Sequence, residues 1–244
     1  MRTIIDGLGW LTTADNWWGR NGIGLLADIP IWSGRQLAGN WDVIWYYAAQ
    51  HVRYTLIAVA LGSLIAIPLS YGAVRRRSTY PALLTITNAI YAIPSIALFV
   101  ILAPALGFTN DKPIIVAMTL YTLVILVRNI VEAIRSVPDS VLRAADGMGY
   151  RPMARFFGVE LPLALPGIVA GLRLAVVSTV SLISVGALVG RGGLGKLFKD
   201  GRDRHIVVEL WSGVIAVVVI ALVLDALVVL VGWFATPWRR AGTA

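Results

Sequence analysis

Long apolar runs, separated by short polar stretches, dominate the chain after residue 53. The first run, Tyr54–Val74, carries no charge and is followed at once by arginines at 75, 76 and 77. Further runs cover Pro81–Leu106, Pro113–Val127, about Pro166–Gly190 and Leu210–Trp238. Because about 20 helical residues cross the hydrocarbon core of a bilayer, the pattern predicts an all-α polytopic membrane protein. We expect five transmembrane helices within a membrane domain over residues 51–238.

Two of these runs contain a feature that changes the prediction. Pro113–Val127 alone would be about 22 Å long, short of a core of about 30 Å, so its helix is predicted to continue past Arg128, with that side chain snorkelling or paired. In the second run, Pro94 removes a backbone donor and Ser95 offers a hydroxyl. Pro94 and Ser95 are therefore either candidate lining of a translocation pathway or an ordinary packing kink.

The first 50 residues are rich in tryptophan and contain no uninterrupted apolar span. Tryptophan is typical of the membrane interface, so residues 1–50 are predicted to be an interfacial, extracytoplasmic segment. A substrate-facing aromatic surface is the alternative, because tryptophan faces attract quaternary ammonium ions. The segment lacks the apolar core and cleavage site of a secretory signal, and none is expected.

Composition supports a membrane protein and excludes several other classes. The chain is 58% hydrophobic and 14% charged, against about 45–50% and 25% in soluble domains. The net charge of +8 is spread between apolar runs, which argues against a nucleic-acid-binding face. There is no cysteine, and His51 and His205 lie far apart in sequence, so neither a thiolate nor a metal site is expected.

The distribution of charges predicts an orientation. Five spans place the triple arginine, the polar stretch at 136–162 and the C-terminal arginines on one side of the membrane. Lysines and arginines alone are balanced between the two sides, but acidic residues are more frequent on the other side. The arginines on the side of the polar stretch lie close to the ends of spans, which favours that side as the cytoplasmic one. The N-terminus is then outside, and residues 239–244 are a cytoplasmic tail.

The stretch at 136–162 is the longest polar interruption and carries helix punctuation. Ser136 and Asp139 fit a capping box, with Pro138 tolerated in the first turn. Apolar positions then recur at helical spacing, at Val141, Leu142, Ala145 and Met148. Gly147 and Gly149 are predicted to end this helix.

A second short helix is predicted to begin at Pro152. Met153, Phe156 and Phe157 supply its apolar side, and Gly158 and Pro162 are expected to end it. The two helices would form a compact knob. The knob either docks in a partner's groove or packs under its own membrane bundle.

Spacing within this stretch resembles the EAA loop of ABC-importer permeases. The family pattern is Glu-Ala-Ala, three residues, Gly, nine residues, Ile-x-Leu-Pro. This chain has the same intervals, with arginine in place of glutamate and valine in place of isoleucine, at Arg143, Ala144, Ala145, Gly149, Val159, Leu161 and Pro162. The segments AIPSIAL, GMGYRPMARFFGVELPLALPGIVAGLRLA and GALVGRGGLG are also similar to the permeases of osmoprotectant importers.

This resemblance implies a type I ABC importer permease fold and a set of partners. The loop residues would couple the chain to a cytoplasmic ATPase subunit, which would bind ATP and Mg, while this chain would bind no cofactor. A second permease subunit, identical or paralogous, and an extracytoplasmic binding protein would complete the transporter. The cargo would be glycine betaine, choline or carnitine. Methionine or another amino acid is the alternative, because methionine permeases share this plan.

Two readings from other classes also follow from the residues. The chain could be an ATP-independent channel or carrier. An enzyme is not expected, because no acid–base pair, nucleophile triad or metal cluster is found in the runs. The glycines at 190–195 match a dinucleotide-type pattern but follow a span rather than a strand, so they are expected to end the fourth span and shape an outer loop.

Polar residues inside the last two spans complete the candidate sites. Arg173 and Asp225 are costly in a membrane and are expected either to pair with each other or to line the pathway. Ser178, Ser181 and Ser184 recur every three residues and are predicted to share one helix face. That face either lines the pathway or packs against a neighbouring helix.

Overall fold

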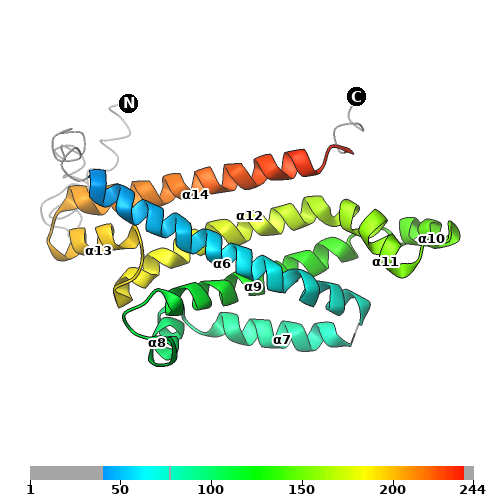
Figure 1. The fold of residues 1–244 in the computed structure, drawn as a ribbon, viewed down its shortest axis with the longest axis horizontal. Coiled ribbons are helices and arrows are strands. Elements are labelled where there is room, and N and C mark those ends of the chain that lie inside the picture. The colour runs from blue at the N-terminus through cyan, green and yellow to red at the C-terminus, as the bar shows by residue number, and fades with distance from the viewer. Residues whose placement is uncertain (1–40, 77, 239–244) are drawn as a thin grey trace, which may run out of the picture.

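The computed structural model describes residues 41–76 and 78–238, and every regular element in that part is helical. The chain folds into an elongated bundle whose long helices run between two ends (Figure 1). The elements are α6 (Trp41–Arg75), α7 (Thr79–Ala92), α8 (Ser95–Leu106), α9 (Lys112–Arg135), α10 (Asp139–Gly147), α11 (Pro152–Arg155), a π-helix (Phe156–Glu160), α12 (Leu161–Val185), a 3-10 turn (Gly186–Val189), α13 (Gly195–Asp203) and α14 (Val207–Ala235).

Four helical segments are long and apolar enough to cross a membrane: α6, α9, the continuous run from Pro152 to Val189, and α14 from Glu209. The predicted second span is divided at Pro94 into α7 and α8, whose axes are bent by 93°. If this bent pair counts as one span, the number is five, as predicted. The continuation of α9 past Arg128 is confirmed, and Arg128 pairs with Glu132 at 3.1 Å.

The central helix is α9. In its most apolar stretch of 18 residues, 72% is buried within the chain. Helices α6 and α12 pack along it, and α14 packs on α12. By contrast, only 6% of the most apolar 18-residue stretch of α14 is buried. The bundle therefore leaves most of α14 to be covered by lipid or by another protein.

Small residues let the helices approach closely, as is common in membrane bundles. A Cβ atom on Gly171 of α12 would lie 2.4 Å from Cβ of Asn129 on α9, and one on Gly62 of α6 would lie 2.7 Å from Cγ2 of Thr122. The hydroxyls of Thr122 and Thr179 form a buried hydrogen bond of 2.8 Å between α9 and α12. These contacts fix the register of the three central helices.

Helix α6 begins earlier than the first predicted span. It contains Trp41 and Trp45 and runs without a break across the proposed domain boundary at residues 50 and 51. Its 35 residues correspond to about 52 Å, so it is longer than the hydrocarbon core. The remaining predicted interfacial tryptophans, within residues 1–40, and the predicted tail, residues 239–244, lie outside the described residues.

Candidate functional site

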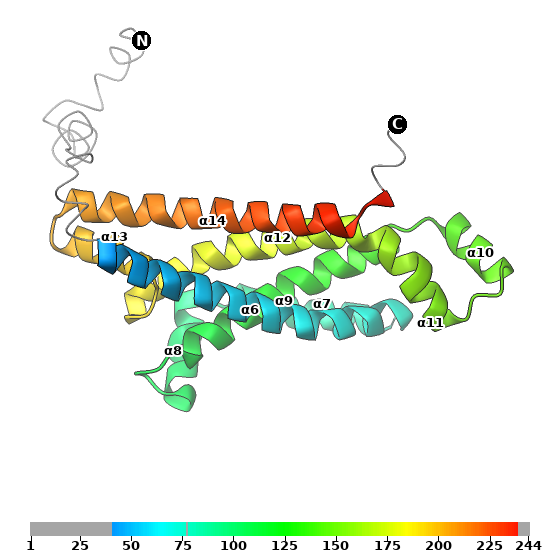
Figure 2. The same cartoon turned by 45° about the horizontal axis from the view of Figure 1, so that its top comes forward.

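The polar segment 136–162 forms one end of the bundle, where α10 projects beyond the long helices (Figure 2). The last turn of α6 and the end of α14 lie at this same end (Figure 1). The loop between α8 and α9, the glycine-rich reversal after α12, and α13 lie at the other end. The arginine-rich end of α6, segment 136–162 and the end of α14 therefore share one end of the bundle, as the sequence predicts.

The predicted capping box at the start of α10 is wrong. The Ser136 hydroxyl does not cap α10; it donates to the carbonyl of Ala133 at 2.8 Å and so ends α9. Pro138, in an extended conformation, precedes the first residue of α10, and Asp139 is in the first turn. The acidic side chain remains favourable at the positive end of the helix.

The end of α10 follows the glycine signal. Gly149 has φ +81°, a conformation that glycine adopts without steric cost. The N–H of Tyr150 donates to Ala145 and that of Gly149 to Asp146, at 3.2 and 3.0 Å. This pair of bonds is a Schellman motif, which satisfies the last carbonyls of the helix.

The predicted stop of the second helix at Gly158 and Pro162 is also wrong. The helix that starts at Pro152 passes through a π-turn at Phe156–Glu160 and continues as α12. Pro162 has no N–H to complete the helical bond to the carbonyl four residues earlier, and a π-turn is one way in which a helix absorbs such a missing bond. Segment 136–162 therefore contains one separate short helix, α10, followed by the start of a long helical run that continues into α12.

A charged cluster that the sequence analysis missed holds this segment together. The Arg155 guanidinium donates to Glu160 at 2.9 Å and to both carboxylate oxygens of Asp146 at 2.6 Å. The Glu160 side chain is only 5% exposed, and that of Arg155 19%. Arg155 thus links the last turn of α10 to the π-turn. The available signal was an arginine with acidic residues nine positions before it and five positions after it, at Asp146 and Glu160.

The last turns of α6 provide a second anchor. Arg75 donates to the carbonyl of Pro152 at 2.5 Å, and its guanidinium lies over the ring of Tyr71. Tyr71 packs edge-to-face on buried Phe156, with ring centroids 4.5 Å apart. Arg75 was interpreted from sequence only as a topology signal, but it also fixes the start of α11.

The resulting surface is apolar and basic. Four large side chains are exposed on it: Met148, Tyr150, Met153 and Phe157. Of the motif residues, Ala145 is buried, Val159, Leu161 and Pro162 are partly buried, and Arg143, Ala144 and Gly149 are exposed. Within the described residues, Arg143 makes no ion pair. An exposed guanidinium beside exposed apolar side chains is a surface that a partner protein can cover.

At the break at Pro94, a backbone carbonyl accepts a hydrogen bond from a residue that the sequence did not indicate. The hydroxyl of Tyr121 on α9 donates to the carbonyl of Ile93, next to exposed Pro94. Tyr91 packs edge-to-face on Tyr121. The replacement hydroxyl that was predicted from Ser95 is thus supplied by Tyr121.

The three serines of α12 do not share one exposed face. Ser181 is exposed, Ser178 is partly buried and Ser184 is buried. Residues three apart on a helix are separated by about 300° of rotation, so each step moves the side chain about 60° around the axis. Ser181 is therefore the most accessible of the three, and Ser184 is turned into the bundle.

Arg173 and Asp225 form a bidentate ion pair between α12 and α14. Nε and one terminal nitrogen of Arg173 each donate to an Asp225 oxygen at 2.8 Å. Their side chains remain 47% and 22% exposed on the surface of this chain. The pair therefore joins two helices and is also accessible from outside the single subunit.

Comparison with known proteins identifies the family. Residues 58–236 match the family described as binding-protein-dependent transport system inner membrane component. The chain belongs to this family. It is 32% identical to the choline transport system permease protein OpuBB of Bacillus subtilis over 78% of this chain and 87% of the relative. It is 33% identical to the osmoprotectant import permease protein OsmW of Salmonella typhimurium over 72% and 84%.

The fold is shared with a solved transporter. A chain of the MetNI methionine ABC transporter, in an inward-facing conformation, superposes with a TM-score of 0.68 at 23% identity, covering 81% of this chain and 95% of that chain. This inner membrane component therefore has the type I ABC importer permease fold and is a multi-pass membrane protein.

The opposite end of this inner membrane component is closed by a tight chain reversal. Gly190 and Gly193 have positive φ, and a Cβ on Gly192 would lie 2.2 Å from the backbone nitrogen of Ala187. Arg191 bonds to Asp111 at 2.8 Å and to the carbonyl of Thr109, which ties the reversal to the start of α9. The expectation that these glycines end the fourth span and shape a loop is confirmed.

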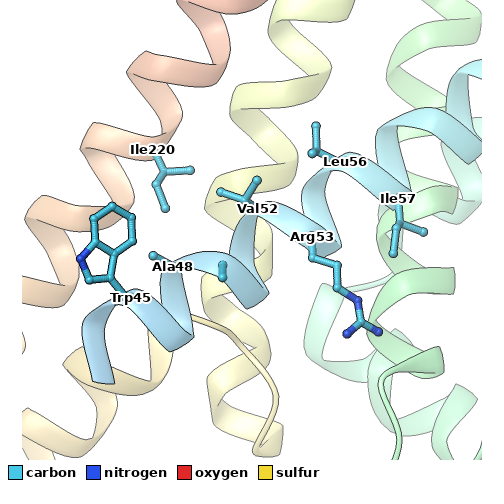
Figure 3. A pocket seen from close by; sticks show the side chains of 8 residues that line it. Trp45, Ala48, Val52, Arg53, Leu56, Ile57 and Ile220 are labelled. Carbon is cyan, nitrogen blue, oxygen red and sulfur yellow. The ribbon is translucent and has the colours of Figure 1, made fainter. Parts of the chain in front are cut away.

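An open hollow of about 590 Å³ lies on the outer surface of α6, beside Ile220 of α14. Figure 3 shows its apolar lining, with Trp45 and Val52 beside Ile220, while the Arg53 side chain points away from them. Arg53 instead approaches Asp111 at 3.8 Å. The hollow therefore presents almost no polar group that could recognise a small charged cargo.

Proposed function

We propose that this inner membrane component is the permease subunit of an ATP-driven importer, and that segment 136–162 is its coupling loop. The observation that carries the coupling proposal is the projecting α10 together with the exposed apolar side chains that follow it, Met148, Tyr150, Met153 and Phe157. A small helix with apolar anchors suits a groove on a partner protein. The partner is a cytoplasmic ATPase subunit, which binds ATP and Mg and hydrolyses the ATP.

The motif residues divide between two roles in this proposal. Arg143, Ala144 and Gly149 are exposed and contact the ATPase directly. Ala145, Val159, Leu161 and Pro162 are buried or partly buried and hold the loop against the bundle. Arg143 stands where the resembled motif has glutamate, so the groove that receives it is expected to offer an acidic or carbonyl oxygen.

The proposed cargo is a quaternary ammonium osmoprotectant such as glycine betaine, choline or carnitine. The relatives whose names carry choline or osmoprotectant transport are about one-third identical and are aligned over most of their length. The alternative, methionine, is supported only by a shared fold at 23% identity. An extracytoplasmic binding protein delivers the cargo, and a second permease subunit, identical or paralogous, completes the membrane part.

The proposed orientation places the coupling end in the cytoplasm. Arg75, Arg76 and segment 136–162 lie at that end, together with the C-terminus of α14. The N-terminal end of α6, the reversal at 190–195 and α13 then face outward. The protein resides in the cell membrane.

Reconstitution tests the proposal. The chain is placed in liposomes with and without its ATPase and its binding protein, and uptake of labelled glycine betaine, choline, carnitine and methionine is measured. We expect uptake of a quaternary ammonium compound only when ATP and both partners are present. Uptake by this chain alone, indifferent to ATP, would show an independent channel or carrier. ATP-dependent uptake of methionine, without uptake of the other three compounds, would show that the cargo is methionine rather than a quaternary ammonium compound.

A further inference from the structure

Two exposed ion pairs lie on the membrane-spanning helices, one near the middle of α12 and the other closer to the end of α9. Arg173 is the central residue of α12, twelve residues from either end, and Asp225 lies about 15 Å from the C-terminal end of α14. Arg128 lies about 10 Å from the end of α9 and pairs with Glu132. The side chains of the second pair are 67% and 57% exposed.

Helix packing places both pairs on one side of the chain. Gly171 of α12 lies against Asn129 of α9, and Arg173 and Arg128, each within two residues of this contact, are exposed rather than turned into it. Helix α6 crosses over α9 and α12 (Figure 1) and packs on both of them. The exposed stripe of α12 on either side of Arg173 carries small or polar residues as well as apolar ones, including Gly167, Ala170 and Ser181.

This side is unsuited to lipid. Charged side chains at membrane depth cost several kcal/mol each in hydrocarbon and face a bundle interior or a water-filled cavity. The outer face of α14 is different, because its exposed residues there are apolar, for example Leu222 at 64% exposure and Val231 at 65%. The chain therefore has a face suited to lipid and a face that requires water or charged groups.

We propose that Arg128, Glu132, Arg173 and Asp225 form a charged collar that lines a water-filled part of the translocation route and exchanges ion pairs with passing cargo. A zwitterion such as glycine betaine carries both signs of charge. Its carboxylate pairs with Arg173 while its ammonium group faces Asp225, and the protein pair re-forms when the cargo leaves. The assignment of this cargo rests on the proposed function.

The exchange explains why a charged pair is kept at this depth. A pair that served only to join two helices can be replaced by apolar side chains of similar volume with little loss, and often with a gain, in stability. A pair that meets cargo cannot be replaced in this way, because the apolar surface offers nothing to a charged solute leaving water. Packing and cargo contact therefore make opposite predictions for the same variant.

The decisive variant is Arg173→Met combined with Asp225→Leu in the complete transporter. We expect assembly with the ATPase and ATPase stimulation by the loaded binding protein to be within about twofold of wild type, with cargo uptake reduced at least tenfold. The matched control is Lys199→Met with Asp203→Leu, an ion pair of α13 outside the spans, which should leave uptake unchanged. Uptake by the first double variant within twofold of wild type would overturn the proposal.

Cysteine labelling tests the water-filled route independently of uptake. Because the natural chain has no cysteine, Ala170→Cys and Ser181→Cys report only on the exposed stripe, and Leu222→Cys reports on the outer face of α14. A charged, membrane-impermeant thiol reagent is applied from each side of the membrane in the nucleotide-free state. Labelling of the first two but not of Leu222→Cys is expected. Absence of labelling at both stripe positions, although the thiols react after denaturation, would contradict a water-filled route.

The two tests separate this inference from the proposed function. If the wild-type complex shows no ATP-dependent uptake, the proposed function fails, and labelling still decides whether the collar is in water. If the wild type transports and the apolar double variant does too, only the collar proposal fails.

Discussion

Glu160 is buried, and its carboxylate accepts a hydrogen bond of 2.9 Å from the Arg155 guanidinium. Removal of the guanidinium would leave a buried carboxylate without its partner. Arg155 also reaches Asp146, so one side chain holds both the end of α10 and the π-turn. The geometry of the proposed coupling loop therefore depends on a residue outside the motif.

Arg155→Met is expected to lower the stability of the protein by about 3–5 kcal/mol, the usual cost of breaking a buried ion pair from one side. The loss should appear as a lower midpoint of thermal unfolding in detergent and as faster proteolysis between α10 and α11. Asp146→Asn is the matched comparison, because Asp146 is largely exposed and its pair should contribute at most about 1 kcal/mol. Adding Glu160→Leu to Arg155→Met should recover most of the loss; no recovery would contradict this account.

Substitutions at Gly149 should follow backbone conformation rather than side-chain volume. A Cβ there meets no atom within 4 Å, but φ is +81°. Gly149→Asn should retain co-purification with the ATPase, because asparagine tolerates the left-handed region, whereas Gly149→Val should lose most of it. Gly147→Ala is the control, because its Cβ also meets nothing and its φ is not positive. Equal loss in the Asn and Val variants would show that the partner surface itself excludes a side chain.

The effect of replacing a glycine in a spanning helix by alanine should depend on how closely a neighbouring helix packs against it. Gly171→Ala would bring a Cβ within 2.4 Å of Asn129 and is expected to destabilise the protein by about 1–3 kcal/mol through overpacking. Gly72→Ala in α6 meets nothing within 4 Å and should stabilise the helix by up to about 1 kcal/mol. Thermal unfolding of the two variants in the same detergent provides the measurement. Similar midpoints for both would rule out close packing at Gly171.

Tyr121→Phe should weaken the junction between α7 and α8. It removes the hydroxyl that donates to the partly buried Ile93 carbonyl, and the net loss of one such hydrogen bond is about 0.5–1.5 kcal/mol. We expect faster hydrogen exchange at the first residues of α8, measured in detergent, with the exchange of α12 unchanged. Tyr91→Phe, which keeps the packing against Tyr121, is the control. Unchanged exchange at the junction would mean that water already satisfies this carbonyl.

Much of the fold could be predicted because hydrophobic runs and membrane thickness leave few solutions. The helical class, the positions of α9, α12 and α14, and the break at Pro94 all followed from apolar length and from proline chemistry. The end of α10 followed from the conformational freedom of Gly149. These signals are local, so a single sequence contains them.

The errors arose where a tertiary contact overrides a local signal. Ser136 has a residue type suited to a helix start, but its hydroxyl bonds backward to Ala133. Gly158 and Pro162 are typical of a helix end, but the π-turn carries the chain through them. The roles of Arg75, Tyr121 and Arg155 depend on partners distant in sequence or brought together by the fold, which no spacing rule identifies.

The π-turn has a mechanical consequence. Because it joins α11 to α12 without a loop, residues 152–189 form one run of 38 residues, about 57 Å long, from the coupling loop to the reversal at the opposite face. In the proposed coupling, this run connects the two ends of the bundle. A displacement of α10 by the proposed partner would then be passed along a continuous helix, and the π-helix at Phe156–Glu160 lies next to the point where that displacement begins.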